Sequence, residues 1–235
     1  MRCLLEIIQD VCTSVHKLPI PANVIGNNDE DVVLMLRLLQ SLGNQLSQKK
    51  SLQATDEQAT FTTVAGENQG KLTTLAAGFK KLRPHSLYDG LNTAIEASDR
   101  WLYLREYRPS TGHYRIRNGE LHMLGVSAGE TWTFEYQSKN WIIADDAMTN
   151  IARFQNDQDC PRIDDELLTL GVIAKYLGTK GLPNDLEVEE YNSYEDAIIA
   201  NQRGTDSVFI NSNTEAEYAS NLEAARASAM RVIVE

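Results

Sequence analysis

Histidines are the first side chains to test for chemistry, because imidazole is a common general base and a common metal ligand. The chain has four of them: His16, His85, His113 and His122. No two stand four residues apart, as zinc-binding histidines on one helix do, and none lies in a known ligand motif. We therefore interpret all four as surface or structural residues and expect no metal or other cofactor.

Carboxylates crowd residues 145–166 and are the other group that could do general acid–base chemistry. The cluster lacks the alternating oxygen-ligand pattern of a calcium loop. The chain also lacks G-x-S-x-G, G-x-x-x-x-G-K-[ST] and G-x-G-x-x-G motifs. We favour helix caps and solvated carboxylates, and predict that the protein is not an enzyme. The enzymatic alternative is a small hydrolase that uses the carboxylates of residues 157–166.

The three cysteines are Cys3, Cys12 and Cys160. An odd number without C-x-x-C spacing predicts neither a disulfide framework nor a zinc site. We therefore expect three reduced thiols in a cytoplasmic setting.

Charge and hydropathy exclude two further classes of protein. The net charge is −11, from 22 basic and 33 acidic residues, so we expect no coating of nucleic acid through its phosphates. No apolar run approaches the roughly 20 residues that span a bilayer. Charges interrupt the apolar residues at the start of the chain, and we expect no signal peptide there.

Helical periodicity dominates both ends of the chain. Residues 164–204 carry two apolar stripes separated by a break at Leu182 and Pro183, which predicts an αα-hairpin. Residues 2–16 and 30–48 predict two more helices, the second capped by Asn28 or Asp29. These helices need partners, because an isolated hairpin cannot bury both of its apolar faces.

The middle of the chain, from about residue 56 to 145, has the alternation of β-strands. Asn118 and Gly119 stand between two alternating runs, which is a strong signal for a two-residue hairpin turn. Residues 58–64 and 131–136 predict further strands, the latter with Trp132, Phe134 and Tyr136 on one face. We expect residues 138–143 to continue the edge of the same antiparallel sheet.

These elements predict an α+β fold: a discontinuous bundle of about four helices, an inserted small antiparallel β domain and an extended C-terminal arm. The expected boundaries are 1–50 and 151–204 for the two parts of the bundle, 51–150 for the β domain and 205–235 for the arm. The arm has helix-favouring residues at 215–230 and two short apolar segments. We expect these segments to dock on a partner, and they consist of Val208, Phe209, Ile210, Val232, Ile233 and Val234.

Residues 80–117 are locally basic, with eight Lys or Arg against four Asp or Glu. We favour contacts between subunits or a solvated face over contacts with nucleic acid. Arg115 and Arg117 share one strand face and are candidates for such an interface. Trp132 and Trp141 are added to the candidates, because tryptophans more often anchor a core or an interface than stack on nucleic acid bases.

The chain resembles the head-to-tail adaptor proteins of tailed bacteriophages, above all those of short-tailed phages, over residues 1–204. No single segment is specific, but their combination and order are. The segments are LPIPANVIGNNDEDVV, QATFTTVAGENQGKL, YRIRNGELHML, TWTFEYQSKNWI and IDDELLTLGVIAKYLGTKGLP.

The resemblance implies a structural virion protein without catalytic activity, found in the virion neck and, during assembly, in the host cytoplasm. It implies a homo-oligomeric ring, commonly a dodecamer, that binds the portal and supports the tail nozzle and tail fibres. DNA would pass through the ring without specific binding, and no membrane would be involved. Another neck or tail-completion component is the alternative within the same class.

Overall fold

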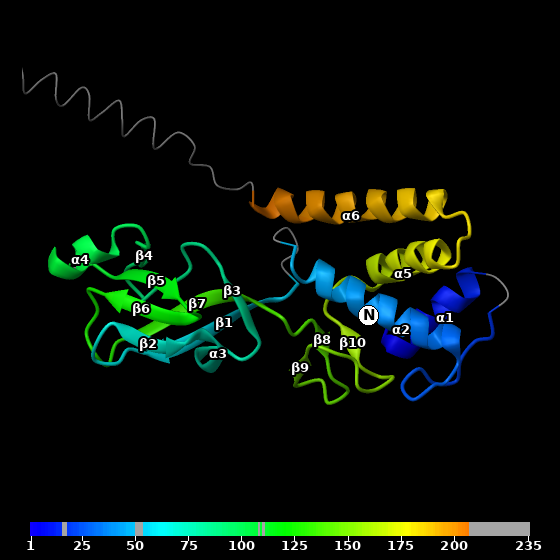
Figure 1. The fold of residues 1–235 in the computed structure, drawn as a ribbon, viewed down its shortest axis with the longest axis horizontal. Helices are drawn as coiled ribbons and strands as arrows, with labels where there is room; N and C mark the ends of the chain where they lie inside the picture. The colour runs from blue at the N-terminus through cyan, green and yellow to red at the C-terminus, as the bar shows by residue number, and fades with distance from the viewer. Residues whose placement is uncertain (16–17, 50–53, 108, 110, 207–235) are drawn as a thin grey trace, which may run out of the picture. The chain divides into compact units, whose positions relative to one another are not determined.

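A computed structural model describes residues 1–15, 18–49, 54–107, 109 and 111–206 (Figure 1). These residues form a mixed α+β structure of helices and several small, mainly antiparallel sheets. Nearly all of them belong to one structural unit, Met1–Glu195, and a second unit begins at Asp196 within the last helix. The helices are α1 (Leu4–Ser14), α2 (Glu30–Leu46), α3 (Leu72–Leu75), α4 (Trp101–Tyr107), α5 (Asp165–Thr179) and α6 (Asp185–Asp206).

The long helices lie where the apolar periodicity predicts them, and aspartates cap two of them. The Asp29 carboxylate accepts hydrogen bonds from the backbone N–H groups of Asp31 (2.9 Å) and Val32 (3.3 Å) at the start of α2. Asp164 accepts one from Leu167 (2.9 Å) at the start of α5. Both aspartates satisfy N–H groups that have no partner within the helix, and their charge favours the positive end of the helix dipole.

Helices α1, α2 and α5 pack together, although α5 is remote from the other two in the chain (Figure 1). Gly171 on α5 allows a close approach, since a Cβ there would lie 2.5 Å from Leu42 Cδ2 on α2 and 2.9 Å from Tyr191 Cε2 on α6. On α6 the predicted stripe is only partly covered, because Val188 is 39% exposed. The shared core of the first three helices includes Leu4, Ile7, Ile8, Val11, Met35, Leu39, Leu42, Leu167, Leu168 and Val172.

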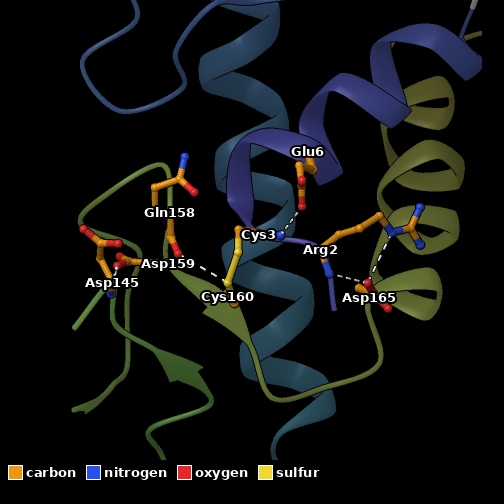
Figure 2. Close-up of a disulfide and its surroundings, with 8 residues drawn as sticks. All are labelled: Arg2, Cys3, Glu6, Asp145, Gln158, Asp159, Cys160 and Asp165. Atoms are coloured by element: carbon orange, nitrogen blue, oxygen red, sulfur yellow. Dashed lines mark hydrogen bonds and ion pairs between the residues drawn. A yellow bond between two sulfur atoms is a disulfide. The ribbon is translucent and has the colours of Figure 1, made fainter. Parts of the chain in front are cut away.

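Arg2 fastens the start of α1 to the start of α5. Its backbone N–H and its Nε donate to Asp165 Oδ2 at 2.6 and 3.2 Å (Figure 2). Its Nη1 donates to Asp10 (2.6 Å), and its Nη2 contacts Glu166. Burial alone would lower the pKa of Arg2, but the hydrogen bonds to Glu166, Asp10 and Asp165 outweigh burial and raise that pKa. The guanidinium therefore stays charged and joins two helices through three carboxylates.

We expect Arg2→Met to lower the free energy of unfolding by about 1–3 kcal/mol, because it leaves the partly buried Asp165 carboxylate without its cation. Arg153→Met is the control, since Arg153 is exposed and forms no ion pair with a described residue. Urea denaturation of the two variants measures the difference. Equal midpoints would show that this ion-pair cluster does not hold the helices together.

The described strands form three small sheets. One has the order β1-β7-β3, a second β2-β6-β5-β4, and a third β10-β8-β9. All neighbouring pairs are antiparallel except β4 and β5, which are parallel. The strands are β1 (Asp56–Thr62), β2 (Asn68–Lys71), β3 (Phe79–Leu82), β4 (Ile95–Glu96), β5 (His113–Arg117), β6 (Glu120–Leu124), β7 (Thr131–Ser138), β8 (Ile142–Ile143), β9 (Asn150–Ile151) and β10 (Cys160–Pro161).

The predicted continuation of one sheet through residues 138–143 is wrong. Strand β7 ends at Ser138, and the Asn140 N–H donates to Ser138 Oγ (3.1 Å), which turns the chain. Strand β8 then pairs with β9 and β10 in a separate sheet. The apolar pattern predicted a strand correctly but not the sheet to which it belongs.

The first two sheets share an apolar core that matches the predicted alternation. Trp132, Phe134 and Tyr136 are all buried on one face of β7. Phe134 meets Phe61 of β1 edge to face, with 5.9 Å between ring centroids. The hairpin turn is also as predicted, because Asn118 and Gly119 adopt φ values of 53° and 76° between β5 and β6.

Burial removes both predicted interface tryptophans from that role. Trp132 and Trp141 are 1% and 0% exposed, so neither can reach a neighbouring subunit without rearrangement. Trp141 packs against Gly43 of α2, where a Cβ would collide with the indole ring. Its Nε1 donates to Asn44 Oδ1 (2.9 Å), and Phe154 meets its ring edge to face. Gly43 therefore lets the indole ring of Trp141 pack directly against α2.

The expectation of three reduced thiols is wrong. Cys3 and Cys160 form a disulfide across 157 residues of sequence, while Cys12 is free and buried (Figure 2). The Leu4 N–H donates to the Asp159 carbonyl (2.9 Å), which brings the start of α1 alongside β10. Cysteine spacing could not predict this pair, because only the tertiary fold makes the two residues neighbours.

Two further expectations concern membrane spans and the C-terminal arm. Among the described residues, no helix is both long and apolar enough to cross a membrane. The six predicted docking residues of the arm, which are Val208, Phe209, Ile210, Val232, Ile233 and Val234, lie outside the described residues, and so does His16.

Candidate interaction surface

The carboxylates that a hydrolase would use are held in structural contacts. Asp157 accepts hydrogen bonds from the backbone N–H groups of Val24 and Ile25, at 2.7–3.2 Å. Asp159 is fully buried and accepts three more, from Asp145, Gln155 and Asn156. With Asp164 capping α5 and residues 165–166 bound to Arg2, each of these groups already stabilises a loop or a helix end.

The described histidines are dispersed. His85 lies in a turn with φ 57°, and His113 Nδ1 lies 2.8 Å from the Thr111 carbonyl. No group of three or more His, Cys, Asp or Glu that could hold a metal ion occurs within the described ranges. His122 is different, because it faces a tryptophan and an arginine.

Trp101, Arg115 and His122 form a stack that joins α4 to the β5–β6 hairpin. The Arg115 guanidinium carbon lies 4.4 Å from the centroid of the Trp101 ring, in cation–π geometry. His122, opposite Arg115 in the β5–β6 register, meets the same indole edge to face at 6.5 Å. Trp101 is 2% exposed, so the stack fixes α4 against the sheet and orients the arginine.

The polar atoms of this stack are not satisfied within the described protein. Trp101 Nε1, Arg115 Nε and His122 Nδ1 are all buried and have no hydrogen-bond partner. Arg115 and Arg117 also form no ion pair with a described residue. Burial, together with the nearby charge of Arg117 and Arg105, lowers the pKa of Arg115 from its usual value, while Glu67 opposes that shift. Such a cluster of cations favours a carboxylate brought in from outside.

Exposed aromatic side chains lie on α4, the helix that contributes Trp101 to the stack. Tyr103 and Tyr107, one helical turn apart, stack with 4.2 Å between ring centroids, and both are exposed. Leu102 next to them is 75% exposed. Tyrosine and arginine are enriched at protein interfaces, whereas a large exposed apolar side chain is costly without a partner. We use the term α4 face for the exposed side chains of α4, which are Leu102, Tyr103, Arg105, Glu106 and Tyr107, together with Arg115 and Arg117 of β5.

The sequence analysis found part of this surface and missed the rest. It singled out Arg115 and Arg117 of β5, and the structure places Arg115 against Trp101 of α4. It did not single out Tyr103, Tyr107 or Leu102. The i, i+4 spacing of the two tyrosines in a short helix was the available signal, but apolar spacing alone does not distinguish an exposed helix face from a buried one.

A second surface of opposite charge lies among α1, α5 and α6. It is a groove of about 520 Å³, and Arg2 lies in its wall. Arg2 pairs with Asp10 and Glu166 of this groove, and Glu187 and Glu190 also line it. We define the acidic groove by these carboxylates: Asp10, Glu166, Glu187 and Glu190.

Comparison with known proteins assigns no family to the chain. The chain matches no protein-family model, and no curated protein matches it. Its function must therefore be argued from its own residues and from the resemblance of its segments.

Proposed function

We propose that the protein is a structural virion component that forms a ring adaptor between the portal and the tail of a tailed bacteriophage. The observation that carries the proposal is the α4 face: Tyr103 and Tyr107 are exposed, and Arg115 and Arg117 form no ion pair with a described residue. Part of that face lies on the hairpin whose sequence, YRIRNGELHML, resembles the adaptor family. The adaptor architecture, a helical bundle with an inserted β domain, also fits the packing of α1 and α2 against the remote α5.

A ring requires two different complementary surfaces on every subunit, because each contact repeats by rotation. The α4 face and the acidic groove supply two surfaces of opposite charge. The net charge of −11 also suits a channel through which DNA must slide, since carboxylates repel phosphates. In this function the partners are identical subunits, the portal, and the nozzle and fibre proteins.

Reversing the charge of the predicted interface arginines, with Arg115→Glu and Arg117→Glu together, is expected to weaken ring assembly at least about tenfold, because like charges oppose association. The readout is ring formation on the portal, followed by electron microscopy. Lys71→Glu is the control. Lys71 is exposed on β2, which pairs with β6 on the side opposite β5. Unchanged assembly of the double variant, with circular dichroism confirming its fold, would contradict the assignment.

Removing residues 205–235 is expected to leave the folding of the remaining chain intact and to impair docking on the portal. The reason is that the apolar segments of this arm can add a strand to an exposed sheet edge of a partner. Thermal unfolding and portal co-sedimentation of the truncated chain separate the two effects. Normal docking by the truncated chain would refute a docking role for the arm.

Two other functions compete with this proposal. A tail-completion or nozzle component would share the α4 face but would not form a ring directly beneath the portal. A hydrolase would need the carboxylates of residues 157–166, which are engaged in backbone hydrogen bonds and ion pairs. Imaging the neck distinguishes the first alternative, and an activity that survives in a purified monomer would favour the second.

A further inference from the structure

We propose that the Cys3–Cys160 disulfide is a redox switch, which opens to two thiols in a reducing environment and closes again by thiol–disulfide exchange while the fold around it stays intact. The co-reactant is a low-molecular-weight thiol such as glutathione for opening, and the corresponding disulfide for closing. The inference goes beyond the proposed function and does not depend on it. Its failure would leave the adaptor function untouched, because the switch belongs to the isolated chain.

The disulfide lies outside the hydrophobic core, where a small thiol can reach it. Both of its cysteines are half-buried, and Figure 2 shows the bond between the start of α1 and β10. Cys12, in contrast, is 1% exposed and takes no part in exchange. Exposed disulfides are typical of the labile and regulatory class, whereas structural disulfides resist reduction by the glutathione pool.

Contacts on both sides of Cys3 hold the two sulfur-bearing segments together independently of the disulfide. The N–H of Leu4 donates to the carbonyl of Asp159, the residue before the second cysteine, at 2.9 Å. On the other side, the N–H of Arg2 donates to the Asp165 carboxylate at 2.6 Å. Reduction therefore removes one link among several, and the two thiols stay within reach of each other. Closing again is then an intramolecular step that needs no refolding.

The surroundings of the two cysteines assign Cys3 as the attacking thiolate. Cys3 is the N-cap residue of α1, where the positive end of the helix dipole stabilises a thiolate. The Glu6 carboxylate, which accepts a hydrogen bond from the Cys3 N–H at 2.9 Å, opposes this effect (Figure 2). Cys160 Sγ lies 3.3 Å from the Gln158 carbonyl oxygen, which can accept a hydrogen bond from a protonated thiol and so favours the neutral form.

The closing reaction consists of two exchanges. The Cys3 thiolate attacks one sulfur of glutathione disulfide, forms a mixed disulfide and releases one glutathione thiolate. The Cys160 thiolate then attacks the Cys3 sulfur and releases the second glutathione. The protein thiols lose two protons and two electrons in total, and the glutathione disulfide takes them up as it becomes two glutathione molecules. Opening is the same sequence in reverse.

Glutathione exchange on the native full chain tests the switch. The oxidised protein is incubated with millimolar reduced glutathione without denaturant, and its thiols are then alkylated and counted by mass spectrometry. The Cys3 and Cys160 thiols should appear, and should disappear again when excess glutathione disulfide is added, while the circular dichroism spectrum stays unchanged. A disulfide that opens only in denaturant, or whose opening unfolds the chain, would overturn the inference.

Variants with a single remaining thiol test the assigned roles. In a Cys12→Ala background, Cys160→Ser leaves only the Cys3 thiol, and Cys3→Ser leaves only the Cys160 thiol. With glutathione disulfide near neutral pH, the mixed disulfide should form on Cys3 at least about tenfold faster than on Cys160, because the thiolate is the nucleophile. Adding Glu6→Gln to the Cys160→Ser variant should accelerate the reaction, since glutamine keeps an acceptor for the Cys3 N–H but removes the opposing charge. Equal rates at the two cysteines would contradict the assignment of Cys3 as the attacking thiolate.

Discussion

Replacing Trp141 by alanine is expected to lower the free energy of unfolding by about 3–5 kcal/mol, the range for deleting a fully buried aromatic side chain. Trp141 is 0% exposed and fills the space that Gly43 leaves on α2. The substitution also removes the hydrogen bond to Asn44 and the contact with Phe154. Because Trp141 joins α2 to the segment that precedes α5, the loss should affect the whole unit rather than one loop.

Urea denaturation followed by circular dichroism measures this effect, and Tyr107→Ala is the control. Tyr107 is also aromatic but is 67% exposed, so its removal should change stability by less than about 0.5 kcal/mol. Equal stability of the two variants would mean that Trp141 is not a core residue.

Loss of the Cys3–Cys160 disulfide is expected to lower the free energy of unfolding by about 2–5 kcal/mol, because this crosslink restrains a long loop of the unfolded chain. The sequence separation of 157 residues places it among long-range crosslinks. Cys3→Ser should reproduce the effect of a reducing agent, and the reducing agent should then have no further effect. Urea denaturation with and without reductant gives both numbers.

Cys12→Ala supplies the matched control, since it removes the remaining thiol and leaves the disulfide in place. Its loss of stability should be smaller and should not depend on reductant. Thiol titration of the oxidised, denatured protein should find one reactive thiol per chain. Three reactive thiols would show that the disulfide does not form in the isolated protein.

Local features of the fold could be predicted from the sequence because their causes are local. The periodicity of residues 30–48 and the carboxylate of Asp29 define α2 and its cap. Asn118 and Gly119 tolerate positive φ, which determines the hairpin turn. Alternation along residues 131–136 places the side chains of β7 on the correct faces.

Features that depend on tertiary contacts could not be predicted in this way. Nothing near Cys3 indicates that Cys160 will lie beside it, since that proximity follows from the packing of α1 against α5. A tryptophan in a strand is equally consistent with a core and with an interface, and only burial shows that Trp132 belongs to the core.

The candidate surface shows the same division between local and tertiary causes. The alternation of Arg115 and Arg117 indicates that they share a face, but not that α4 packs beside them. The cation–π contact with Trp101 depends on that packing. The acidic groove combines residues of α1 with residues of the distant helices α5 and α6, so no local pattern could reveal it.

Electron microscopy of the virion neck tests the account most directly. The proposal places this chain in a phage particle, which should be imaged with the chain labelled and compared with particles made without it. The account predicts a closed ring of labelled subunits between portal and tail, with neighbouring subunits in contact through the α4 face and the acidic groove. Particles that keep their DNA and acquire tails without this chain, or a label found away from the neck, would contradict it.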